Sequence, residues 1–383
     1  MTASPGPARG PLHGVRVVEL GGIGPAPFAA MMLADLGADV VRVHRVGEAA
    51  EPNAALDRGR RSIAVQLKDP RGVEVVRELA AGADALIEGF RPGVLERLGL
   101  GPRELHAANS ALVIGRMTGY GQDGPFAPRA GHDINYIALS GALAAIGPAG
   151  HRPTPPINLV GDFGGGGMPL ALGVVSAVLS ARATGRGQVV DAAMVEGAAS
   201  LMAMIYGFHG RGQWSVRRGE NLFDSGAPWY DTYACADGRH VAVGALEPQF
   251  FAVLLERLGL SERIDADRQL DRDTWPHQRA EFEAAFAAHP RAHWESVFAD
   301  VDACVTPVLD MDEAPSHPHN VARGAFVTLD GVTQPAPAPR FSGTPTATPA
   351  PAPLVGAHTD EILADLGRDA EQIAQLRAQG VVG

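Results

Sequence analysis

The sequence has few cysteines and lacks the apolar segments typical of secreted and membrane proteins. Its 383 residues include two cysteines, Cys235 and Cys304, which are too few for a disulfide framework and predict a reduced, cytoplasmic protein. The N-terminal stretch MTASPGPARGPLHG has no apolar core of signal-peptide length. Charged or polar residues interrupt the long apolar runs, so we expect no segment that spans a membrane and no membrane partner.

Positive charge is also scarce. Lysine is rare, arginine carries most of the positive charge, and 43 Asp and Glu outnumber 32 Lys and Arg. The formal net charge of -11 argues against a nucleic-acid partner, because proteins that bind nucleic acid generally present a basic surface. A hydrophobic content of 46% and a charged content of 20% are typical of a globular chain, and the length suffices for two domains.

Between Val15 and Arg116, short apolar runs alternate with helical segments. The run VRVVEL (15–20) predicts a buried strand, and DPRGVEVVRELAAG (69–82), with a proline near its start, predicts a helix. Further strands are expected at 39–45, 61–67, 85–90 and 111–120, further helices at 28–37 and 168–182, and a strand followed by a helix within 188–200. The alternation predicts an α/β fold with a Rossmann-like parallel sheet, whose ligands bind at the carboxyl ends of the strands.

The pattern changes after a polar connector at 211–226. Two alternating runs within TYACADGRHVAVGA (232–245) are joined by Asp237-Gly238, a strong hairpin signal. Amphipathic helices are expected at 246–260, 275–289 and 291–299. We therefore predict a large α/β domain over 1–194, a linker over 195–228, a small α+β domain over 229–315, a linker over 316–340, and a return of 341–383 to the large domain through a proline-rich tether.

The glycine-rich turn after the first strand does not have the spacing of a dinucleotide site. Gly21-Gly22-Ile23-Gly24 is not GxGxxG, and Pro25 and Pro27 occupy the following turn. The second strand ends in His44-Arg45 instead of the acidic residue that would bind a ribose. We interpret this segment as a plain strand-to-helix turn.

Three titratable residues lie near predicted helix starts. His132 opens an apolar helix, whose dipole favours a neutral ring able to accept a proton; simple capping is the alternative. Asp162 precedes Gly164–Gly167, whose N–H groups are expected to face a ligand and to stabilise a developing oxyanion; an ordinary cap is again the alternative. A helix N-terminus lowers the pKa of a carboxyl group, so acid catalysis by Asp162 requires burial to raise it. Glu247, just before Pro248, has the position of a first-turn carboxylate.

Arginines gather in the loops of the first hundred residues. This group suits a multiply phosphorylated ligand, and a solvated surface is an equally good alternative. It comprises Arg45, Arg58, Arg60, Arg61, Arg91 and Arg97, with Lys68.

Long, ordered segments carry a family resemblance over almost the whole chain. They include VVELGGIGPAPFAAMMLADLGADVVRV, RMTGYGQDGPF, AGHDINYIALSG, PPINLVGDFGGGG, GRGQVVDAAMVEG and VAVGALEPQF. In these segments the sequence resembles the α-methylacyl-CoA racemases, which are members of the family III CoA-transferase superfamily. One departure is His44, which precedes Arg45 where these racemases usually carry Asp.

The resemblance implies an isomerase that acts on 2-methylacyl-CoA, with His132 and Asp162 as the two catalytic acid/bases and Glu247 hydrogen-bonded to the histidine. It implies an interlocked homodimer with each active site between the large CoA-binding domain of one subunit and the small domain of the other. CoA is part of the substrate, and no metal or separate cofactor is required. The implied CoA contacts are Arg45, Val65, Gln66, Leu67, Lys68, Arg91, Arg97, Gly131, Asp133, Ile134, Asn135 and Tyr136.

The expected reaction inverts the carbon next to the thioester carbonyl, with one group removing a proton and another returning one from the opposite face. The main alternative is a CoA transferase on the same scaffold, with Asp162 as the nucleophile that forms an acyl anhydride. The transferases commonly lack the histidine of the GHD segment, so His132 favours the racemase. A non-catalytic CoA-binding protein is the third alternative, and the retention of His132, Asp162 and Glu247 argues against it.

Overall fold

The computed structural model describes residues 9–48 and 51–383, which divide by packing into two compact units. The first unit runs through Ser140 and adds Ile157–Leu201 and His319–Gly383, and the second comprises Gly141–Pro156 and Met202–Pro318. The predicted boundaries differ from these units in three places, one of which is the packing of 319–340, predicted as a linker, with the first unit. Residues 141–156 pack with the second unit, and the predicted linker at 195–228 contains most of α8 (Met194–Leu201) and all of α9 (Ala203–Gly210). The start of the predicted large domain, with part of the stretch in which we expect no signal peptide, lies outside the described residues.

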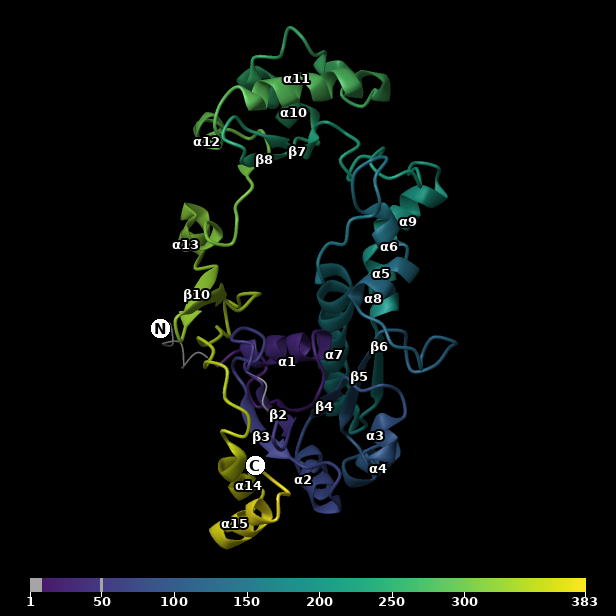
Figure 1. Cartoon of the computed structure of the whole chain (residues 1–383), viewed down its shortest axis with the longest axis vertical. Helices are drawn as coiled ribbons and strands as arrows, with labels where there is room; N and C mark the ends of the chain where they lie inside the picture. The colour runs from purple at the N-terminus through teal and green to yellow at the C-terminus, as the bar shows by residue number, and fades with distance from the viewer. Residues whose placement is uncertain (1–8, 49–50) are drawn as a thin grey trace. The chain divides into compact units, whose positions relative to one another are not determined.

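A six-stranded parallel sheet forms the core of the first unit, in the order β3-β2-β1-β4-β5-β6 (Figure 1). The expected α/β fold with a Rossmann-like sheet is thereby confirmed. The strand order reverses between β1 and β4, which is where such sheets bind ligands. The strands are β1 (Arg16–Leu20), β2 (Asp39–Arg45), β3 (Arg61–Val65), β4 (Ala85–Glu88), β5 (Val113–Thr118) and β6 (Val189–Ala193).

Helices cover both faces of this sheet, which explains why β4 and β5 are buried at every position. α1 (Pro25–Asp35) and α7 (Met168–Thr184) pack on one face. Two groups of helices cover the other face. The first group is α2 (Pro70–Ala81), α3 (Val94–Arg97) and α4 (Pro102–Ala108). The second group, at the C-terminal end and coloured yellow in Figure 1, is α14 (Thr359–Asp365) and α15 (Ala370–Ala378).

One helical stretch in the described part of the chain is longer and more apolar than we expected. Leu159–Thr184, which joins the π-helix η1 (Leu159–Gly167) to α7, is long and apolar enough to cross a membrane by length and composition. Asp162, Ser176 and Arg182 interrupt this stretch, so the expectation that no segment spans a membrane stays a prediction. Leu170 and Val174 of this stretch are buried in the core of the first unit, as in a core helix of a globular protein.

The second unit contains an antiparallel sheet in the order β7-β8-β9, with an aromatic core that includes Trp229, Phe251 and Phe282. The hairpin predicted at Asp237-Gly238 is confirmed, because Gly238 adopts a φ of +74° and β7 pairs with β8. Besides α9, the elements of the second unit are α6 (Ala142–Ala145), β7 (Tyr230–Ala234), β8 (His240–Gly244), α10 (Pro248–Leu258), the 3-10 turns Ala266–Arg268, Arg272–Thr274 and Ala314–Ser316, α11 (Trp275–Ala287), α12 (Arg291–Phe298) and β9 (Val305–Pro307).

The predicted linker at 316–340 has regular structure of its own. It contains α13 (Pro318–Arg323) and a hairpin of β10 (Phe326–Leu329) and β11 (Val332–Pro335). The turn of this hairpin is Asp330-Gly331, with φ values of +47° and +80°. The same Asp-Gly signal that predicted the first hairpin was present here and was missed.

Candidate active site

A cleft of about 820 Å³ in the first unit opens at the carboxyl edge of the parallel sheet. Its walls include the segments that end or follow β1, β2, β4 and β5. His132 and Asp162 both line this cleft, together with Tyr136 and Asn158. The fold thus brings the two predicted acid/base residues into one site, at the edge where a parallel sheet binds its ligands.

Glycines allow the turns around the cleft to approach one another. A Cβ atom on Gly22 would lie 3.5 Å from the Cα atom of Gly89, so the turns after β1 and β4 are in close contact. Gly24, the N-cap of α1, has a φ of +68°, and a Cβ atom there would lie 2.9 Å from Oδ2 of Asp162. The segment interpreted as a plain turn is therefore a wall of the cleft and borders the candidate acid.

Asp162 lies within the π-helix η1 and not in the loop ahead of a helix that we expected. Asn158 Nδ2 donates a hydrogen bond to Oδ2 of Asp162 at 3.1 Å, and the Asp162 N–H donates to Oδ1 of Asp133 at 2.7 Å. Burial raises the pKa of the Asp162 carboxyl; the Asn158 hydrogen bond opposes this shift, the Asp133 charge adds to it, and the His132 charge opposes it. The net direction is upward, so Asp162 holds a proton more readily than an exposed carboxyl.

Gly164–Gly167 permit close packing and do not border the cleft. All four lie in η1. A Cβ atom on Gly165 would lie 2.6 Å from the backbone nitrogen of Ala198 in α8, and one on Gly167 would lie 2.6 Å from the Phe28 ring of α1. The expectation that their N–H groups face a ligand was wrong, because these glycines instead let η1 pack directly on α1 and α8.

His132 is the N-cap of α5 (Asp133–Leu139), and its exposed side chain lines the cleft. The His132 N–H donates to Oδ1 of Asn135 at 3.0 Å, and the His132 carbonyl accepts from the Asn135 N–H at 2.8 Å. This reciprocal pair fixes the backbone that carries the imidazole. Asn135 therefore acts on the histidine and does not line the cleft itself.

Tyr136 braces the loop that leads to His132. Its hydroxyl donates a hydrogen bond to the Gly131 carbonyl, and its ring packs edge-on against Tyr120 with centroids 4.9 Å apart. Burial, followed by the Tyr120 hydroxyl and the Asp162 charge, raises the pKa of Tyr136 to about 12. The phenol therefore stays protonated and keeps this hydrogen bond at neutral pH.

The predicted CoA contacts divide into residues that line the cleft and residues that lie outside it. Arg91, Gly131 and Tyr136 line the cleft. Arg45 and Val65 are paired at the carboxyl ends of β2 and β3, on the same edge of the sheet but outside the cleft. The remaining residues, which also do not line the cleft, are Gln66, Leu67, Lys68, Arg97, Asp133, Ile134 and Asn135.

Three of the grouped arginines form ion pairs within the fold. Arg58 is buried and pairs with Asp35 at 2.6 Å, and Arg61 pairs with Asp39 at 2.8 Å. Arg60 is buried and pairs with Glu19 at 3.0 Å. Phosphate binding by these three side chains is contradicted by the structure, because each is already matched by carboxylates.

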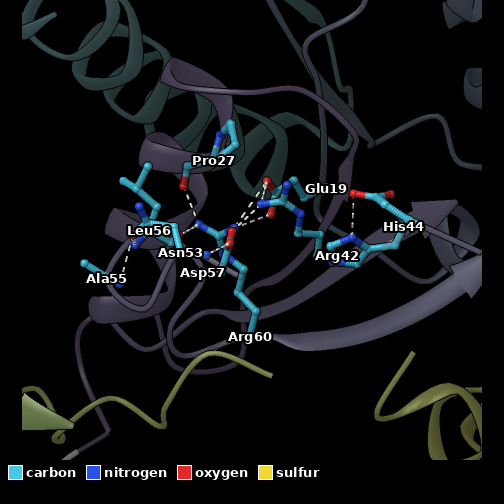
Figure 2. Close-up of polar contacts among 10 residues, drawn as sticks. Glu19, Pro27, Arg42, His44, Asn53, Ala55, Leu56, Asp57 and Arg60 are labelled. Atoms are coloured by element: carbon cyan, nitrogen blue, oxygen red, sulfur yellow. Dashed lines mark hydrogen bonds and ion pairs between the residues drawn. The ribbon is translucent and has the colours of Figure 1, made fainter. Parts of the chain in front are cut away.

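Figure 2 shows the buried charges around Glu19, where Arg60 and Arg42 converge on this carboxylate and on Asp57. Burial raises the pKa of Glu19, and the two arginines oppose that shift. Arg42 also lines the cleft, so this network fixes one of its walls. No local pattern predicts this network, because its members come from β1, β2 and the loop before β3, which are distant in sequence.

Other cleft residues that sequence reasoning missed are Gly24, Asn158 and Arg129. His44, which was not predicted as a site residue, also lines the cleft, with Nδ1 3.4 Å from Oε1 of Glu48. Burial and the Arg42 charge lower the pKa of His44. The spacing of Asn158 and Asp162, four residues apart, would have been a usable signal if a helix had been predicted there.

Glu247 belongs to the second unit, where it is the exposed N-cap of α10 and its carbonyl accepts from the Phe251 N–H at 3.0 Å. Burial and the Glu247 charge raise the pKa of the Cys304 thiol. The predicted hydrogen bond between Glu247 and His132 stays a prediction.

Comparison with known proteins places the chain in a family. The pattern of CoA-transferase family III matches residues 12–359. The α-methylacyl-CoA racemases of Mus musculus and Homo sapiens are 48% and 46% identical to it over 97% of each chain. A crystal structure of a CAIB/BAIF family protein from Brucella suis superposes with a TM-score of 0.81 at 26% identity, covering 94% of this chain and 100% of that one. The chain therefore belongs to CoA-transferase family III.

Proposed function

We propose that this protein is an α-methylacyl-CoA racemase that interconverts (2R)- and (2S)-2-methylacyl-CoA thioesters by proton transfer through an enolate. The observation that carries the proposal is the pairing of His132 and Asp162 in one cleft, with the pKa of the carboxyl raised. A racemase needs two proton-transfer groups, because the planar enolate must be reprotonated on the face opposite to the one that lost its proton. The near-full-length identity to racemases supports the same activity.

The two residues exchange roles with the direction of reaction. In one direction neutral His132 removes the α-proton and protonated Asp162 returns one. In the other direction ionised Asp162 removes the proton and the His132 imidazolium returns one. The raised pKa of Asp162 favours its protonated form, which is the form that the first direction requires.

The cleft also suits the phosphorylated part of a CoA thioester. Arg91 and Arg129 line it, and the guanidinium of Arg129 lies over the Phe126 ring, 4.3 Å from its centroid. Guanidinium groups at the carboxyl edge of a parallel sheet are suited to phosphate oxygens. CoA is then part of the substrate, and the proton transfers require no metal or further cofactor.

We further propose that the protein works as a homodimer in the cytoplasm, with Glu247 of the small unit orienting His132. The apolar side chains of Leu172 and Leu179 on α7 are about 70% exposed, which is a feature expected of a surface that another subunit covers. A carboxylate hydrogen-bonded to His132 would fix the ring and stabilise its imidazolium form.

The alternative is a CoA transferase in which Asp162 attacks the thioester and forms an acyl anhydride. Membership of CoA-transferase family III keeps this alternative open in principle. His132 in the cleft favours proton transfer, because the anhydride chemistry of a transferase does not require a second acid/base beside the nucleophile.

One experiment separates the two activities. A single epimer of a 2-methylacyl-CoA is incubated with the protein in D₂O without any acceptor acid, and deuterium at the α-carbon is followed by NMR. We expect racemisation with label uptake, and we expect His132→Ala and Asp162→Asn to lower the rate by about 10²–10⁴-fold. A protein that takes up no label but forms a new CoA thioester with an added free carboxylate would be a transferase, and unimpaired exchange in both variants would refute the assignment.

A further inference from the structure

Asp133 has a buried carboxylate whose environment is unusual for an acidic residue in the first turn of a helix. The residue is 7% exposed, and its Oδ1 atom accepts the hydrogen bond from the Asp162 N–H at 2.7 Å. Its Oδ2 atom is buried and has no hydrogen-bond partner among the described residues. An unpartnered buried carboxylate oxygen costs free energy, whereas an asparagine would accept the same N–H bond without a buried charge. The charge of Asp133 therefore calls for a role beyond accepting one hydrogen bond.

The hydrogen bond from the Asp162 N–H to the Asp133 carboxylate lies in a closely packed region at the start of η1. Asp162 is the fourth residue of this helix, where N–H groups have no partner within the helix and must be satisfied from outside. The preceding residue is Gly161, on which a Cβ atom would lie 2.4 Å from Oδ1 of Asp133. Only glycine at 161 leaves room for the carboxylate to reach the Asp162 backbone.

We propose that Asp133 is a positioning residue for the proposed racemisation: its carboxylate anchors the backbone of Asp162 and holds a fixed negative charge beside the Asp162 side chain. The anchor sets where the carboxyl group of Asp162 stands in the cleft. The charge makes Asp162 hold its proton more strongly, as an acid in proton transfer must. The inference rests on the proposed function.

The groups around Asp162 are few, which makes the effect of Asp133 separable. The charges of Asp133, in α5, and of His132, its N-cap, act on the Asp162 carboxyl, and α5 also carries the Tyr136 hydroxyl. Asn158, the N-cap of η1, donates a hydrogen bond to the same carboxyl. α1 faces it with Gly24, which has no side chain. The titratable residue on α8 is Glu196, which is exposed.

The test compares Asp133→Asn and Asp133→Ala with Asp123→Asn, a control on the exposed part of the loop that leads to α5. Asparagine keeps the acceptor and removes the charge, so the apparent pKa of Asp162 in the kcat/KM profile of α-proton exchange should move to lower pH. Alanine removes the anchor as well, and should lower kcat by about 10²-fold with little change in KM, because Asp133 does not line the cleft. The control should leave both the profile and kcat unchanged.

A second readout does not depend on activity. The Asp162 carboxyl, labelled with carbon-13 and assigned with Asp162→Asn, should titrate at lower pH in Asp133→Asn than in the unmodified chain. If the unmodified protein shows no α-proton exchange while the titration of the Asp162 carboxyl still moves in Asp133→Asn, the proposed function is refuted and the effect of Asp133 on Asp162 is supported. If Asp133→Asn folds and moves neither the titration nor the kinetic profile, the role proposed for Asp133 is overturned.

Discussion

The sharpest test of the cleft geometry is the substitution Gly24→Ala. Gly24 has a φ of +68° and a ψ of -106°, a conformation that a residue with a side chain rarely adopts. The backbone strain should cost about 1–3 kcal/mol of stability. The new Cβ atom would also lie 2.9 Å from Oδ2 and 3.4 Å from Cγ of Asp162, so the carboxyl group must swing away from its position.

The consequence for activity should exceed the consequence for stability. Displacement of a reacting group by about 1 Å lowers rates by about 10²-fold, and we expect a loss of this size in deuterium exchange at the α-carbon. Gly14→Ala is the matched control, because Gly14 has a φ of +81° and a Cβ atom there would meet nothing within 4 Å. It should show a similar loss of stability with near-normal exchange.

Thermal unfolding and exchange rates are measured on both variants. If Gly24→Ala keeps normal exchange, or if Gly14→Ala loses as much exchange as Gly24→Ala, then the position of the Asp162 carboxyl does not govern the rate and the geometric argument is refuted.

Two further predictions concern a buried ion pair and the pH dependence. Arg58→Met should lower the free energy of unfolding, measured in urea, by about 3–5 kcal/mol, because Asp35 is left buried and unpaired. The control is Arg103→Met: the Arg103 side chain is 92% exposed, so this substitution should change the free energy of unfolding by less than about 0.5 kcal/mol. Asn158→Ala removes the hydrogen bond that lowers the pKa of Asp162, so the corresponding limb of the kcat/KM profile should move to higher pH. A limb that moves to lower pH would contradict this account.

The parallel sheet was predictable because its signal is local. Each strand from β1 to β5 is a short apolar run bounded by turn residues, and such runs alternate with helices. The position of the cleft followed from the sheet alone, since ligands bind at the carboxyl ends of parallel strands. The hairpin at Asp330-Gly331 was equally local, and it was missed within the stretch that we predicted as a linker.

The buried arginines were not predictable because their partners are distant in sequence. Arg58 is matched by Asp35 and by Gln334, which lies 276 residues further along the chain. Nothing near DRGRRS distinguishes such a residue from an exposed phosphate ligand. Composition shows that the chain carries many arginines, and only the tertiary structure shows which of them are already neutralised.

The acid at the centre of the proposed mechanism depends on contacts of the same long-range kind. A helix start ordinarily lowers the pKa of a carboxyl group, whereas the pKa of Asp162 is raised because burial outweighs its hydrogen bond from Asn158. Gly24 gives the carboxyl room, and Asp133 holds its backbone. A group whose folded pKa is raised stabilises the fold only when protonated, below its unfolded pKa, and that contribution is lost as the pH rises through the folded value. At neutral pH the fold therefore gives up stability to keep Asp162 ready to hold a proton, which is expected of a residue kept for chemistry and not for packing.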